Sequence, residues 1–139
     1  VVDDEFPLDW NGVDRVTGVI GISGKVSAHV IINFEKAVAL WATTALTGGN
    51  PESIEEVVDA VGELTNIIAG QAKSNLSRLK LTLALPSVIV GRDHEIRFAS
   101  SVKPSVVVFA TEWGNFSIEV GIGDIAKQLP KKSAAAATA

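Results

Sequence analysis

Six polar or small residues recur at helical spacing in the middle of the chain. They are Asp59, Glu63, Asn66, Gly70, Lys73 and Ser77. On a helix, successive members of this set lie within about 60° of one another and form one stripe. The stripe offers carboxylates and an ammonium group for ion pairs and an amide for hydrogen bonds, which suits the docking of a partner protein. The alternative is an ordinary solvated face, which every amphipathic helix has.

Two members of the stripe are unusual for a solvated helix face. Asn66 is a poor helix former, and Gly70 costs about 1 kcal/mol relative to alanine in an exposed helix interior. A glycine on an exposed face is explained when the backbone or a side chain of a partner must come very close to the helix. The pattern therefore predicts a docking surface that includes Asp59, Gly70 and Lys73.

Two other patterns are weak candidates for chemistry. Residues 18–25 only partly match a phosphate-binding loop, because Val19 and Val26 stand where that motif requires glycine and a hydroxyl residue. A strand, and not the required helix, is also expected to follow. His29 and His94 are the only histidines and there is no cysteine, so a zinc site with three or four neighbouring ligands is not expected. We expect no metal and no cofactor in this chain.

A long helix is expected to present the polar stripe. Ser53 and Glu56 form a capping box, in which the serine hydroxyl and the carboxylate reciprocally satisfy free backbone N–H groups. From there the helix is expected to run to about Leu79. An apolar stripe on its other side should pack on a sheet. This apolar stripe consists of Ile54, Val57, Val61, Leu64, Ile68, Ala72 and Leu79.

The remaining elements are expected on both sides of this helix. Residues 16–23 and 26–34 are rich in valine and isoleucine and predict a β-hairpin that turns at Gly24 and Lys25. Residues 35–46 have helical spacing, with Asn33 as a possible N-cap and Gly48 as a stop signal. Further strands are expected at residues 81–85, 94–99, 106–111 and 116–122, with a loop at 86–91. This order is typical of an α+β fold with a mostly antiparallel sheet and two central helices packed on one face.

Composition limits the classes of function. The 139 residues are 47% hydrophobic and 20% charged, which is typical of one globular domain, here expected at residues 1–130, with a disordered tail at 131–139. A net charge of −4 gives no basic footprint for nucleic acid. No apolar run approaches the ~18–20 residues of a membrane span, so we expect a cytoplasmic protein that does not enter the membrane.

The segment from Asp59 to Gly70 resembles the signature of the CheC/CheX/FliY phosphatases. That signature is Asp or Ser, three residues, Glu, two residues and Asn on a helix, which Asp59, Glu63 and Asn66 match. Residues 71–77 and 85–91 resemble the CheX branch in particular, and the resemblance covers roughly residues 16–123. CheC members carry a second copy of the motif, which residues 35–46 lack. The resemblance therefore implies one site per chain and favours the CheX branch.

The resemblance implies an α+β fold and a phosphatase that hydrolyses the aspartyl phosphate of a CheY-like response regulator in chemotaxis signalling. Asn66 would orient a water in line with the phosphoryl group, and Glu63 would pair with a lysine of the receiver. Asp59 would support them. Magnesium would sit in the acidic pocket of the receiver, and a valine-rich edge strand would support a homodimer. The alternatives are a docking domain without catalysis, for receivers or flagellar-switch proteins, and a domain whose polar helix face has no partner.

Overall fold

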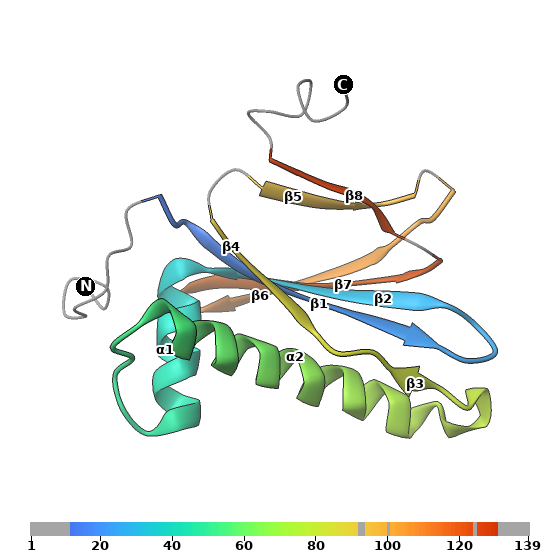
Figure 1. The fold of residues 1–139 in the computed structure, drawn as a ribbon, viewed down its shortest axis with the longest axis horizontal. Coiled ribbons are helices and arrows are strands. Elements are labelled where there is room, and N and C mark those ends of the chain that lie inside the picture. The colour runs from blue at the N-terminus through green and yellow to red at the C-terminus, as the bar shows by residue number, and fades with distance from the viewer. Residues whose placement is uncertain (1–11, 92–93, 100, 124, 131–139) are drawn as a thin grey trace.

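The computed structural model describes residues 12–91, 94–99, 101–123 and 125–130. Its centre is a six-stranded antiparallel sheet in the order β3-β1-β2-β7-β6, and β4 also pairs with β1 (Figure 1). The strands are β1 (Arg15–Ser23), β2 (Ala28–Glu35), β3 (Thr82–Leu83), β4 (Ser87–Gly91), β6 (Ser105–Thr111) and β7 (Gly114–Ile122). β3 and β4 both pair with β1. β4 pairs with the first part of β1 and β3 with its end.

Two helices cover one face of this sheet, and a small second sheet lies on the other side (Figure 1). The helices are α1 (Lys36–Thr47) and α2 (Ile54–Asn75), and a short 3₁₀ turn, η2 (Ser77–Leu79), follows α2. The second sheet consists of β5 (His94–Phe98) and β8 (Ile125–Pro130). The structure thus confirms the predicted α+β fold with two helices on one face of a mostly antiparallel sheet. Among the described residues, no helix is long and apolar enough to span a membrane.

The core lies between the helices and the sheet because alternate strand residues point toward the helices. Val16, Ile20 and Ile32 are almost fully buried there, together with Val57 and Val61 of α2. The apolar stripe of α2 is therefore confirmed at its centre. Two further members, Leu64 and Ile68, are half-buried and pack against this core, and Ile54 and Ala72 are also only half-buried.

The buried face of α2 also includes residues that the apolar stripe did not contain. Ala60, Thr65 and Ala69 are buried, and Thr65 is fully enclosed with its hydroxyl bonded to the Val61 carbonyl at 2.7 Å. The cause is Gly18 in β1. A Cβ atom on Gly18 would collide with Oγ1 of Thr65, so the missing side chain lets the helix lie directly on the strand.

Several expected boundaries were wrong. Residues 86–91 contain β4 instead of a loop, because Ser87–Gly91 pairs with β1 over its first half. The helix ends at Asn75 and not near Leu79. Asn33 does not cap α1, since its side chain accepts a hydrogen bond from Thr17 at 2.9 Å within the sheet, and Glu35 is the N-cap residue. β8 was not expected, and the tail at 131–139 lies outside the described residues.

The contact between Gly18 and Thr65 generates the first prediction. Gly18→Ala should lower the free energy of unfolding by about 1–3 kcal/mol, because the added methyl group overpacks a fully buried site. The double variant Gly18→Ala/Thr65→Ala should lose less stability than the sum of the losses in Gly18→Ala and Thr65→Ala, because the Thr65 hydroxyl is then absent from the crowded site. Urea denaturation of the three variants measures this coupling. Strictly additive losses of stability would show that there is no steric contact between the side chains at positions 18 and 65.

Candidate functional site

The long helix α2 is a platform that is capped at its start. The Ser53 hydroxyl accepts a hydrogen bond from the Glu56 N–H at 3.3 Å, as the capping box predicted. The Glu56 carboxylate accepts from the N–H of Glu52 at 2.8 Å, one residue before the cap. Glu55 and Glu56 in the first turn and Lys73 in the last turn also suit the helix dipole.

The structure places the predicted polar stripe on the outer face of α2. Asp59, Glu63, Asn66 and Lys73 are all exposed. Their side chains make no hydrogen bond or ion pair with any residue that the structure describes. Ser77 lies beyond the helix in η2, so the stripe as a helical feature ends at Lys73. We call the outward turns from Asp59 to Lys73 the crest of α2.

Gly70 faces open space, as the stripe predicted. No atom lies within 4 Å of the position that its Cβ would occupy. The glycine is therefore not required by packing inside this chain. It leaves a bare stretch of backbone one turn beyond Asn66 on the crest.

A hollow of about 380 Å³ borders the crest on the side of β4. We call it the proline hollow. Asp59, Glu63 and Asn66 form part of its wall from the helix. The rest of its lining is mostly apolar and consists of Val58, Gly62, Leu85, Pro86 and Val88. The amide of Asn66 thus stands at the edge of an apolar depression that is open to solvent.

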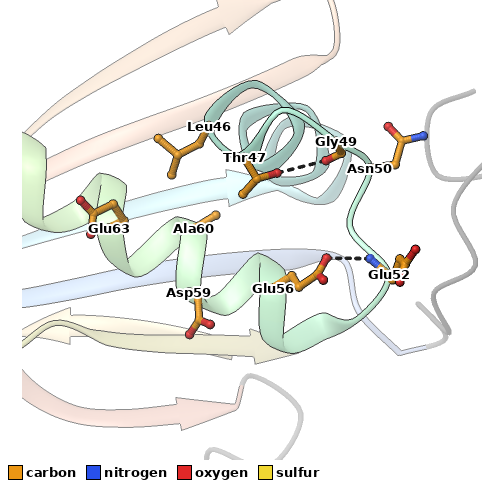
Figure 2. A pocket seen from close by; sticks show the side chains of 9 residues that line it. All are labelled: Leu46, Thr47, Gly49, Asn50, Glu52, Glu56, Asp59, Ala60 and Glu63. Atoms are coloured by element: carbon orange, nitrogen blue, oxygen red, sulfur yellow. Dashed lines mark hydrogen bonds between the residues drawn. The ribbon is translucent and has the colours of Figure 1, made fainter.

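A second hollow of about 590 Å³ lies between α2, the end of α1 and the loop that joins them (Figure 2). Four carboxylates belong to its lining, from Glu52, Glu56, Asp59 and Glu63, and no lysine or arginine of the described residues does. We call it the acidic hollow. Asp59 and Glu63 border both hollows, and the hollows differ in their other walls, which contain Glu52 and Glu56 on one side of the crest and Leu85, Pro86 and Val88 on the other.

This arrangement suits recognition and positioning more than covalent catalysis. An exposed amide offers one acceptor and two donors and can hold a water molecule. The acidic hollow attracts a basic group of a partner, because carboxylates in a partly enclosed site interact more strongly than on open surface. Among the described residues, no group of three or more histidine, cysteine or acidic side chains is placed to hold a metal ion.

Sequence reasoning identified the crest but missed the walls of both hollows. Glu56 was assigned only to the helix cap and Glu52 had no expected role, although both line the acidic hollow. Leu85 and Pro86 were read as the end of a strand, whereas they stand beside Glu63 and Asn66. No local pattern could reveal Leu85 and Pro86 as neighbours of the crest, because their place depends on how β4 pairs with β1.

Comparisons with known proteins give one family. The model of the family described as chemotaxis phosphatase CheX matches residues 16–110. A comparison with curated protein sequences finds no match. Among solved structures, the chain is similar to a chemotaxis protein CheX from Desulfovibrio desulfuricans, with 33% identity, a TM-score of 0.72 and coverage of 82% of this chain and 79% of that one.

Two further structures share the fold. A CheX protein from Vibrio vulnificus is 32% identical, with a TM-score of 0.71 and coverage of 79% of this chain and 76% of that one. The CheX–CheY–BeF₃–Mg²⁺ complex from Borrelia burgdorferi gives a TM-score of 0.65 at 18% identity and covers 88% of this chain and 91% of that one. At that identity the likeness extends to the fold alone.

The open space at Gly70 generates the second prediction. Gly70→Ala should raise the free energy of unfolding by up to about 1 kcal/mol, because alanine restricts the unfolded chain and fits the helix without contact. Gly70→Leu should also fold with a melting temperature near or above that of the wild type. The measurement is thermal unfolding of each variant.

Gly48 provides a matched control for this prediction. It ends α1 with φ at +85°, so the same change to alanine should destabilise the protein there. A marked loss of stability in Gly70→Ala would contradict the placement of this residue on the outer face.

Proposed function

The chain belongs to the chemotaxis phosphatase CheX family, and we propose that it hydrolyses the aspartyl phosphate of a CheY-like response regulator. The solved complex of a CheX with a CheY, beryllofluoride and magnesium supports a phosphorylated receiver as the partner class. The observation that carries the proposal is the crest of α2. There Glu63 and Asn66 are exposed and without a partner among the described residues, between two hollows.

Asn66 is the proposed water-orienting residue. Hydrolysis of an aspartyl phosphate needs a water in line with the leaving carboxylate oxygen, and its products are the free aspartate and inorganic phosphate. Positioning and electrostatics supply most of the acceleration in such a reaction. The carboxamide of Asn66 can hold this water and direct its lone pair at phosphorus. Because the amide is neutral, it does not repel the phosphoryl anion as a carboxylate would.

Glu63 is the proposed anchor, one helical turn before Asn66. Glu63 lines both hollows, and its carboxylate can pair with the lysine that receivers carry beside their phosphorylated aspartate. The other three carboxylates of the acidic hollow add attraction for the same cation. Asp59 is a supporting member of this group. Lys73, two turns beyond Asn66, is proposed to meet acidic surface of the receiver.

Magnesium belongs to the receiver in this proposal, and the chain needs no cofactor of its own. The metal would neutralise charge on the phosphoryl group from the receiver side, while Asn66 acts from the side of the attacking water. Gly70 leaves room for the receiver beside Asn66, since no atom of this chain occupies that space. A response regulator as partner also supports a cytoplasmic location.

A homodimer is the second part of the proposal. β6 is the last strand of the large sheet, and its outer edge is unpaired among the described residues. Val106, Val107, Val108 and Phe109 are between 40% and 65% exposed, so this edge is apolar on both faces. Such an edge is a template for pairing with another strand. Pairing with β6 of a second copy would cover it.

The site generates the third prediction, which separates docking from turnover. Glu63→Ala should mainly raise the receiver concentration at half-saturation, because it removes an ion pair. Asn66→Ala should mainly lower the rate at saturating receiver, by about 10²-fold or more, because it removes water alignment. The measurement is phosphate loss from a panel of phosphorylated receivers, first with the wild type and then with each variant.

Two exposed residues of α2 outside both hollows are the controls. Glu55→Ala and Asn75→Ala remove the same chemical groups from the two ends of the helix and should leave both kinetic parameters near wild type. Full activity of Asn66→Ala on a receiver that the wild type dephosphorylates would refute the mechanism. Tight binding of phosphorylated receivers without acceleration by the wild type would favour a docking domain.

The edge strand generates the fourth prediction. Val108→Lys should convert a dimer into a monomer, because a charge on β6 opposes pairing of two edges. Thr82→Lys places the same charge on exposed β3 at the opposite end of the strand order and should leave the dimer intact. Sedimentation velocity over a range of concentrations measures both. A wild type that stays monomeric at high concentration would remove the dimer.

A further inference from the structure

Leu85 is unusually exposed for a large apolar residue. Its side chain is 90% exposed, and the next most exposed large hydrophobic residue that the structure describes is Ile122, at 69%. Single exposed apolar residues are common on protein surfaces. This one is not an isolated surface residue, because it lies beside Glu63 and Asn66 in the wall of the proline hollow.

The backbone holds the Leu85 side chain in its outward position. Before it, Leu83 pairs with Ile22, and the N–H of Ala84 donates to the Gly21 carbonyl at 2.9 Å. After it, Pro86 restricts the backbone, and Ser87 begins the pairing of β4 with β1. The segment is therefore tied to β1 on both sides of Leu85. A leucine on such a segment cannot turn inward without breaking the sheet.

The proline hollow brings this segment against the crest. The position of a Cβ on Gly62 would be 3.5 Å from Cγ2 of Val88 and 4.0 Å from Cγ of Pro86, which is ordinary packing contact. Gly62 lies immediately before Glu63, so β4 packs on the turn of α2 that carries the proposed anchor. Leu85 stands at the end of this contact and extends the apolar wall outward.

We propose that Leu85 is an apolar anchor for the phosphorylated receiver. Its side chain packs against an apolar side chain of the receiver that lies next to the phosphoaspartate. This inference rests on the proposed function and adds a specificity-determining residue to it. A receiver that places its phosphoaspartate at Asn66 covers the proline hollow, because Asn66 and Leu85 share its wall. The burial of Leu85 then contributes to affinity without taking part in the reaction.

The two hollows together fix the orientation of the receiver. The acidic hollow selects a basic group on one side of the crest, and Leu85 selects an apolar group on the other. A receiver that was turned around on the crest would move its basic group away from Glu52 and Glu56 and place its apolar group against these two carboxylates. The second exchange leaves charged groups without partners, which is costly. A second copy of this chain is a poorer occupant of the proline hollow. The apolar edge proposed to pair two copies, β6, lies at the other end of the strand order.

The test is equilibrium binding to a receiver that beryllofluoride and magnesium hold in its phosphorylated form. The receiver is one from which the wild type accelerates phosphate loss. Leu85→Ala should raise the dissociation constant about tenfold or more, because the apolar area of a leucine is no longer buried. The rate of phosphate loss at saturating receiver should stay within about twofold of wild type. Leu85→Met, which keeps the apolar volume, should bind nearly as well as wild type.

Ile122→Ala is the matched control, since Ile122 is also highly exposed but lies on β7, away from both hollows. It should leave the dissociation constant unchanged. A dissociation constant of Leu85→Ala within about twofold of wild type would overturn the inference. So would a change in sedimentation without a change in receiver binding, which would assign Leu85 to contact between copies.

The outcomes also separate this inference from the proposed function. If the wild type releases phosphate from no receiver, the phosphatase assignment fails. The dissociation constants of the wild type and of Leu85→Ala are then compared for the receivers that bind as beryllofluoride complexes. Weaker binding by the variant still supports Leu85 as the anchor. If no receiver binds, both proposals fail. Leu85→Gln serves as a second variant, and thermal unfolding of each variant checks that its fold is intact.

Discussion

The contact between Thr65 and Gly18 fixes the rotation of α2 about its own axis, and the candidate site depends on that rotation. Thr65 is fully buried against a strand residue that has no side chain to separate them. Because each residue of a helix advances by about 100°, an inward Thr65 places Asn66 about 100° and Glu63 about 160° away from it, on the outside. A rotation that placed Asn66 at the inward position of Thr65 would turn its amide, and the Asp59 carboxylate on the same side of the helix, toward the core, where they would lack partners.

The site consists of solvated groups on a rigid support. Asp59, Glu63 and Asn66 make no bonds with described residues, so docking of a partner need break no internal hydrogen bond. The helix that carries them is capped at its start and packed along its inner face. Their backbone positions relative to one another are therefore set before a partner arrives, which removes the backbone contribution to the entropic cost of aligning a water. The hollows on either side share Asp59 and Glu63 but differ in their outer walls, acidic on one side and apolar on the other, which makes the two sides of the crest distinguishable.

The local parts of this structure could be predicted from the sequence, and the non-local parts could not. The crest residues follow from helical spacing alone, and Gly70 was correctly placed on the outside because it belongs to the same period. By contrast, Pro86 resembled the end of a strand, yet β4 begins directly after it, where its missing N–H is tolerated. The pairing of β4 with β1 joins segments about seventy residues apart, and local patterns contain no information on it.

The cap of α1 shows the same limit. Asn33 has the residue type of an N-cap, but its side chain accepts a hydrogen bond from Thr17 across the sheet. Glu35 takes the N-cap position, and its carboxylate accepts a hydrogen bond from the Asn115 N–H at 2.9 Å and not from the helix. The acidic hollow likewise needs the end of α1, with Leu46 and Thr47, to lie beside Glu63 of α2. The sequence therefore predicted which residues of α2 face outward, while the surface around them required the structure.

The most direct test of the central claim is a crystal structure of this protein bound to a receiver that carries beryllofluoride and magnesium. The account predicts that the Asn66 carboxamide lies within hydrogen-bond distance of a water, or of the position a water would take, in line with the bond between the aspartate oxygen and the phosphoryl mimic. It also predicts the Glu63 carboxylate at the lysine of the receiver. A complex in which another face of the protein meets the beryllofluoride, with Asn66 away from it, would contradict the account.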